Sequence, residues 1–90
     1  MKVPEFKTTE ELKSWIEEQD FESVSYFHDF PEAIVGITTD NCLVYSMQKM
    51  VESLVKEGMN NEDAIDYLCY NTLRTLPYMS EERPIIIDDL

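Results

Sequence analysis

Two apolar stripes with the period of an α-helix, separated by a short connection, constrain the fold of this chain more than any other feature. The first stripe lies in residues 46–57 and consists of Met47, Met50, Val51, Leu54 and Val55. The second lies in residues 61–76 and consists of Ala64, Ile65, Leu68, Cys69, Thr72, Leu73 and Leu76. A connection this short predicts a helical hairpin. We expect the central residues of both stripes to be buried: Leu54, Val55, Ile65 and Leu68.

The residues at the ends of these two stripes support the boundaries. Gly58 follows the first stripe, and glycine adopts at low cost the left-handed conformation that ends a helix. Asn60 is a favoured N-cap, and Asp63 three positions later completes an approximate capping box. Pro77 follows the second stripe and predicts a stop there.

The first thirty residues predict another helix and a less regular segment. Thr8–Glu11 has the Thr-x-x-Glu form of a capping box and precedes apolar residues at helical spacing, which predicts a helix over residues 9–19. Trp15 is either its core anchor, which we favour, or an exposed interaction residue. Phe21–Phe30 alternates without a clean polar face, and we interpret it as a short strand.

The remaining segments predict strands. Ala33–Thr38 and Cys42–Tyr45 flank residues with turn chemistry, which predicts a β-hairpin over residues 33–45. Gly36 within it indicates a bulge or a close approach of another backbone. The apolar run Ile85–Ile87 predicts a strand over residues 84–88, with Asp88 and Asp89 in solvent.

The order of these elements predicts an α+β fold in a single domain of residues 1–90. We expect a small antiparallel sheet, made of the hairpin and the C-terminal strand. One face of this sheet is expected to be covered by the N-terminal helix and the helical hairpin.

The charge bears on the class of partner. The net charge is −12, and residues 1–30, 31–60 and 61–90 contribute −5, −2 and −5. With only 7 Lys and Arg residues, direct binding to nucleic acid is disfavoured, because phosphate contacts need a basic face. The acidity either keeps the protein soluble or mimics DNA for a basic partner. We find no apolar run of about 18 residues and no secretory leader, and therefore expect a cytoplasmic protein with no membrane span.

The residue types that carry chemistry do not form a recognisable set. His28 is the one histidine, and no third group orients it toward Cys42 or Cys69. The two cysteines are not spaced as a metal site, and the acidic pairs lie at i, i+1, where their side chains point apart. We expect no catalytic residues, no metal and no cofactor.

The strongest candidate for an interaction surface lies in the second half of the helical hairpin. Tyr67, Asn71 and Arg74 recur at i, i+4 and i+7, beside the apolar stripe. Tyr and Arg are enriched at protein interfaces, whereas Asn71 and Arg74 could equally fix the loop 77–83 by hydrogen bonds. The complete set of candidate interaction residues is Trp15, Tyr67, Tyr70, Asn71, Arg74 and Tyr78.

Several motifs between residues 33 and 87 form a recurring pattern. They are Ala33–Asp40, Val44-Tyr45, Met50–Glu52, Glu57–Met59, Glu62–Ile65 and Tyr70–Tyr78. This pattern resembles short acidic proteins of bacteria and their phages or mobile elements, a group without an established activity. The resemblance implies a phage or mobile-element setting. The expected function is a small non-enzymatic domain that binds another protein, such as a host protein; the alternative is a DNA-mimic inhibitor of a host nucleic-acid enzyme.

Overall fold

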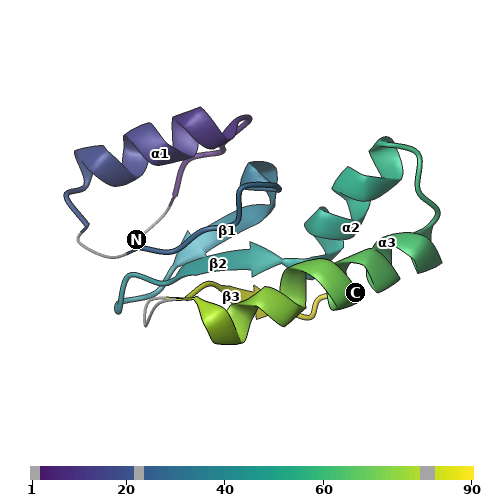
Figure 1. The fold of residues 1–90 in the computed structure, drawn as a ribbon. Coiled ribbons are helices and arrows are strands. Elements are labelled where there is room, and N and C mark those ends of the chain that lie inside the picture. Colours follow the sequence, from purple (N-terminus) through teal and green to yellow (C-terminus); the bar gives the residue numbers. More distant parts are fainter. Residues whose placement is uncertain (1–2, 22–23, 80–82) are drawn as a thin grey trace.

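The computed structural model describes residues 3–21, 24–79 and 83–90 and shows an α+β fold (Figure 1). The chain starts with helix α1 (Thr9–Glu18), a 3₁₀ turn η1 (Pro31–Ala33) and the strands β1 (Ile34–Ile37) and β2 (Leu43–Ser46). Helices α2 (Met47–Lys56) and α3 (Asn61–Tyr67) follow. A π turn η2 (Leu68–Thr72), a 3₁₀ helix η3 (Leu73–Tyr78) and the strand β3 (Ile85–Ile87) complete it. The predicted α+β class is confirmed.

Side-chain caps fix where the helices begin. The Thr8 hydroxyl accepts a hydrogen bond from the Glu11 N–H at 3.2 Å, and Asn60 Oδ1 accepts one from the Asp63 N–H at 2.8 Å. Each bond satisfies one of the backbone donors that a helix leaves free in its first turn. Both caps agree with the sequence prediction.

The hairpin β1–β2 is antiparallel and carries the bulge expected at Gly36. Its register shifts between Ile34 and Gly36. A side chain built on Gly36 would meet no atom within 4 Å, so the alternative of a close backbone approach is wrong. The turn is closed by the Thr38 N–H donating to the Cys42 carbonyl at 2.9 Å, with Asn41 in the left-handed region at φ 65°.

The sheet is mixed, with strand order β1-β2-β3, and is not wholly antiparallel as predicted. Ile85–Ile87 pairs with Val44–Ser46 in parallel. Parallel neighbours need a long crossover connection, and the helical segment from α2 to η3 is that connection, because it returns the chain to the start of β2. The prediction that the C-terminal strand joins the hairpin is confirmed; its direction was wrong.

The helix expected over residues 61–76 changes character after Tyr67. Pro77 lies inside η3, where it has no N–H to donate and its ring is incompatible with an α-helical carbonyl four residues earlier. Side chains satisfy backbone carbonyls in this irregular stretch. Asn71 Nδ2 donates to the Tyr67 carbonyl at 3.0 Å, and the Thr75 hydroxyl donates to the Thr72 carbonyl at 2.7 Å. Asn71 thus bonds within its own helix and not to the loop 77–83, of which residues 80–82 lie outside the described part.

Most of the predicted core is buried. Leu54 and Leu68 are buried and Ile65 is partly buried, but Val55 is 40% exposed, so its placement in the core was wrong. Successive helical residues point about 100° apart, and Leu54 takes the inward direction in this last turn of α2. Trp15 is half-buried and packs edge-on against Phe6 at a ring distance of 5.6 Å.

Residues 24–30 form no strand, contrary to the prediction for Phe21–Phe30; residues 22–23 lie outside the described part. Phe27 and Phe30 are instead directed into the core, and Phe30 turns the chain with a left-handed φ of 65°. The Phe27 N–H finds a partner in the buried Tyr45 hydroxyl at 3.1 Å. Because the Phe27 N–H already has this partner, pairing the segment with an edge of the sheet would not satisfy an additional donor at Phe27. Burial raises the pKa of Tyr45 well above its ordinary value.

Candidate functional site

The register of the sheet separates a buried face from an exposed one. Ile34, Tyr45 and Ile86 are neighbours across the three strands; Ile34 and Tyr45 belong to the core, and the partly buried Ile86 packs against it. Ile34 is 6% exposed and Tyr45 is 0% exposed, because the helices and the segment 24–30 pack over this face. Leu43 and its partner Ile37 share this buried face, and the strand alternation places Val44, Ile85 and Ile87 on the opposite face.

The exposed side chains of that opposite face are apolar, and its register also includes Gly36 and the buried Ser46. Val44 is paired with Ile85, and Ile85 and Ile87 are 43% and 41% exposed. Val35, at the bulge of β1, is 43% exposed. We refer to Val35, Val44, Ile85 and Ile87 as the outer sheet face. An antiparallel hairpin that has one face in water ordinarily alternates apolar and polar residues. Here apolar residues stand at positions that face water, where polar residues are ordinary.

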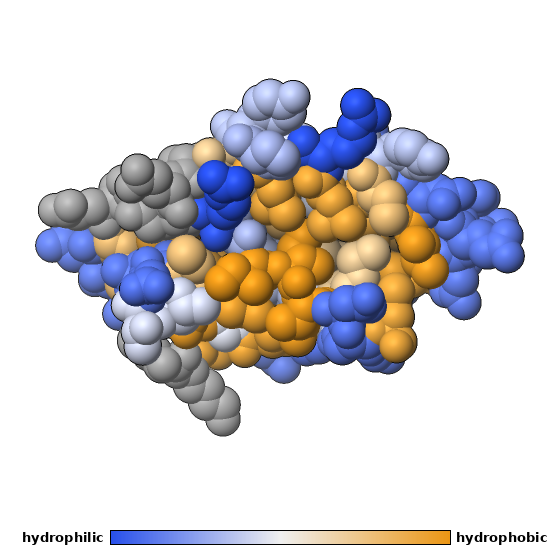
Figure 2. Space-filling view, turned by 90° about the horizontal axis from the view of Figure 1, so that it is seen from below, coloured by the Kyte–Doolittle hydropathy of each residue, from blue (hydrophilic) through white to orange (hydrophobic). Residues whose placement is uncertain are grey.

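Figure 2 views the molecule from below the view of Figure 1, the side on which β3 and the helical turns after α3 lie. A broad apolar area occupies this side, with polar residues around it. Scattered exposed apolar residues are normal on protein surfaces, but a contiguous apolar patch with a polar rim is typical of an interaction site.

Both edges of the sheet are poor templates for an added strand. β3 has three residues, Pro84 precedes it and Asp88 follows it. β1, the other edge strand, is interrupted by the bulge between Ile34 and Gly36. Short strands, proline, charge and bulges are the features by which proteins protect sheet edges from pairing. The part of the sheet that is left for binding is therefore its outer face.

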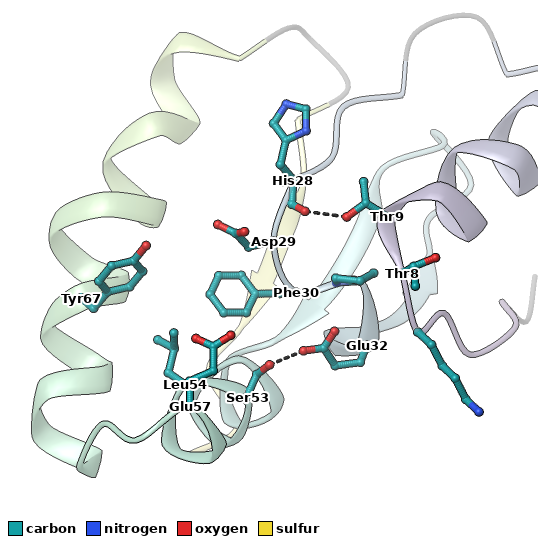
Figure 3. A pocket seen from close by; sticks show the side chains of 12 residues that line it. Thr8, Thr9, His28, Asp29, Phe30, Glu32, Ser53, Leu54, Glu57 and Tyr67 are labelled. Carbon is teal, nitrogen blue, oxygen red and sulfur yellow. Dashed lines mark hydrogen bonds between the residues drawn. The ribbon is translucent and has the colours of Figure 1, made fainter.

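A second feature is a pocket of about 320 Å³ that lies between the start of α1, residues 28–32, the end of α2 and Tyr67 (Figure 3). Hydrogen bonds join its walls. The Thr9 hydroxyl donates to the His28 carbonyl at 2.6 Å, and the Ser53 hydroxyl donates to the Glu32 carboxylate. Asp29 and Tyr67 point toward one another across the pocket. These two hydrogen bonds connect α1 and α2 to residues 28–32 and so stabilise the packing of both helices against that segment.

An adjoining pocket of about 400 Å³ shares His28, Asp29, Phe30 and Tyr67 with the first and also includes Asn71. The two pockets together make a groove along the segment 26–30. The carboxylates beside this groove come from Asp29, Glu32 and Glu57. All three side chains are exposed, which is the ordinary position of solvated acidic residues.

The structure divides the predicted interaction residues among three places. Tyr67 and Asn71 line the groove, while Tyr70 and Tyr78 are 67% and 90% exposed and Arg74 is also exposed. Trp15 lies apart from them, between Phe6 and Phe21 at the N-terminal end. The six residues do not form one surface, and their role in binding stays a prediction.

Sequence reasoning missed the outer sheet face, although the signal was present. Ile85–Ile87 has no polar member, and both hairpin strands have apolar residues at odd and even positions. A strand that is apolar on both faces is typical of a sheet covered from both sides. The helices of this chain cover one side.

The groups considered for catalysis remain separate. His28 lines the groove, whereas Cys42 lies half-buried beside the hairpin turn and Cys69 is exposed on the π turn. Neither cysteine lines either of the two pockets that form the groove. Among the described residues, no group of three or more His, Cys, Asp or Glu side chains is placed to hold a metal ion. Within the same ranges, no helix has the length and apolar character needed to cross a membrane.

In comparisons with models of protein families, with curated proteins and with solved structures, nothing matches this chain.

Proposed function

We propose that this chain is a small, non-enzymatic domain that binds another protein through its outer sheet face. The observation that carries the proposal is the apolar outer face formed by Val35, Val44, Ile85 and Ile87, in a sheet whose edges are protected against strand addition. Burying such side chains contributes about 25 cal/mol per Å². Association with a protein is the direct way to remove them from water in a folded chain.

The DNA-mimic function is less well supported by the positions of the acidic residues. Glu10 and Glu11 lie in the first turn of α1, and Glu62 and Asp63 lie in the first turn of α3. Carboxylates at these positions stabilise their own helices through the helix dipole. These four acidic residues therefore have a structural role, the stabilisation of their own helices, that does not require a nucleic-acid-binding partner.

Quantitative affinity capture from a lysate of the source organism tests the proposal. The double variant Val35→Thr, Ile85→Thr removes apolar surface and retains β-branched side chains that suit strands. Val55→Thr is the matched control, because Val55 is similarly exposed but belongs to α2. We expect one dominant protein to be retained by the unmodified chain and the control and lost by the double variant. Equal retention by all three chains contradicts the proposal, and release of the protein by duplex DNA supports the DNA mimic in its place.

A further inference from the structure

We infer that the pocket between residues 4–6 and helix α1 binds an arginine side chain of a partner protein. This pocket shares no residue with the outer sheet face, and α1 lies at the opposite end of Figure 1 from β3. The inference therefore goes beyond the proposed function and does not depend on it.

The pocket is open to solvent and has a volume of about 410 Å³, which lies within the range of ligand pockets. Its apolar part consists of Pro4, Phe6 and Trp15. Phe6 and Phe21 pack edge-on against the indole of Trp15 at ring distances of 5.6 and 5.8 Å, and Trp15 nevertheless remains partly exposed. The indole is thus held in place before a ligand arrives, which lowers the entropic cost of binding.

The polar part of the pocket consists of Ser14 and four carboxylates, those of Glu5, Glu10, Glu11 and Glu18. Glu5 belongs to the segment before α1 and the other three to α1, so carboxylates approach the pocket from both of its walls. Glu10 and Glu11 stabilise the helix from its first turn and keep their charge. Glu18 lies in the last turn of α1, where the helix dipole disfavours a carboxylate and no basic residue accompanies it. Its charge therefore does not stabilise α1.

The neighbouring cations do not neutralise these carboxylates. No described Lys or Arg residue lines the pocket. Lys13 points about 130° away from the centre of this side of α1, and Lys7 lines two other pockets together with Glu32. When both Lys7 and Lys2, which lies outside the described part, are counted against the four carboxylates, two negative charges remain in excess.

This combination of groups fits the guanidinium group of arginine. A guanidinium stacks on aromatic rings and binds carboxylates through a fork of N–H donors, whereas the ammonium group of lysine is a point charge. Tryptophan is the aromatic residue that attracts cations most strongly. The methylene stem of the arginine would lie along the apolar part of the pocket. A second copy of this chain is a poorer source of that arginine, because two chains with a net charge of −12 repel one another.

Peptide binding to the unmodified chain tests the inference. The probe is a heptapeptide of glycine and serine that has two arginines and uncharged ends. Matched peptides have lysine, or citrulline as the neutral isostere, in place of arginine. Trp15 is the only tryptophan of the chain, so its fluorescence reports on this pocket directly. We expect the arginine peptide to change this fluorescence and to shift the backbone amide resonances of residues 5–18, and the citrulline peptide to bind about tenfold or more weakly.

Two variants and a matched control locate the binding. Glu5→Gln and Glu18→Gln each remove one charge at the pocket, and each should weaken binding of the arginine peptide by about threefold or more. Glu17→Gln is the control, because it removes the same charge from an exposed neighbour on α1 that does not line the pocket. We expect this control to change the affinity by less than about twofold.

Four results would overturn the inference: equal binding of the citrulline peptide, equal weakening by Glu17→Gln, resonance shifts centred outside residues 5–18, or no response to the arginine peptide. Guanidinium ion that binds as tightly as the arginine peptide would overturn the protein partner and assign the pocket to small cations. The double variant Val35→Thr, Ile85→Thr should bind the arginine peptide as the unmodified chain does. Failure of the proposed function is therefore a separate result.

Discussion

The Ser46 hydroxyl donates a hydrogen bond of 2.6 Å to the carboxylate of Asp89, a residue 43 positions later in the chain. The other carboxylate oxygen accepts the Gln48 N–H at 2.9 Å, and Ser46 itself caps α2 by accepting from the Lys49 N–H at 3.2 Å. Asp89 is exposed, as expected, but two hydrogen bonds attach its carboxylate to the first turn of α2. Parallel pairing of β3 with β2 brings the ends of both strands together where α2 begins, and helix N-termini favour carboxylates.

This contact predicts a pH-dependent contribution to stability. The hydrogen bond from Ser46, followed by that from the Gln48 N–H, lowers the pKa of Asp89. A carboxyl group with a lowered pKa in the folded state stabilises the fold above its ordinary pKa of about 4, and this stabilisation is lost as the pH falls through the lowered value. We expect Asp89→Asn to lower the melting temperature at neutral pH and to have a much smaller effect once the pH lies below the lowered pKa of Asp89.

Asp88→Asn is the matched control for this measurement, because Asp88 is the exposed neighbour on the same segment. Thermal melts of both variants across the acid range would compare the two. Equal melting curves for Asp88→Asn and Asp89→Asn at neutral pH would show that the contact with Ser46 does not stabilise the fold.

The hydrogen bond from the Phe27 N–H to the Tyr45 hydroxyl predicts that removing this hydroxyl lowers the free energy of unfolding. In Tyr45→Phe the buried Phe27 N–H loses its partner, and an unsatisfied buried donor destabilises by about 1–3 kcal/mol. Urea denaturation measures the change. Tyr70→Phe, at a residue that is 67% exposed, should change stability by less than about 0.5 kcal/mol. A similar small change for both variants would mean that water replaces the phenol at Phe27.

Leu68 and Val55 are central residues of the apolar stripes that differ greatly in burial, and we expect a large effect on stability at the first and a small one at the second. Leu68 is 0% exposed, so Leu68→Ala should destabilise by about 2–5 kcal/mol through lost burial and a cavity. Val55→Ala should stay within about 0.5 kcal/mol, because Val55 is 40% exposed. Chemical denaturation of both variants checks this. A large loss of stability for Val55→Ala would show that the Val55 side chain is part of the core.

The two glycines predict changes of opposite sign. Gly58 has a φ of +113°, a conformation that strains any L side chain, so Gly58→Ala should destabilise by about 1 kcal/mol or more. At Gly36 an added methyl group meets open space and φ is ordinary, so Gly36→Ala should stabilise by about 0.4–1 kcal/mol. Melting temperatures of the two variants provide the measurement. Destabilisation by both would indicate that the bulge in β1 needs glycine.

Local features determined much of this fold. The period of the apolar residues located both helices of the hairpin and α1, and Thr8, Asn60 and Gly58 marked their ends, because capping and stripe formation involve residues within one or two turns. The apolar run Ile85–Ile87 likewise identified a strand that joins the sheet.

Contacts between distant segments decided the rest. The direction of β3 depends on the path of the intervening helices, and the attachment of Asp89 to Ser46 depends in turn on that direction. The candidate site is of the same kind. The sequence shows that Val35, Val44 and Ile85 are apolar, but only the packing of the helices on one side of the sheet decides that these side chains face outward, because a strand's two faces are equivalent until another layer covers one of them.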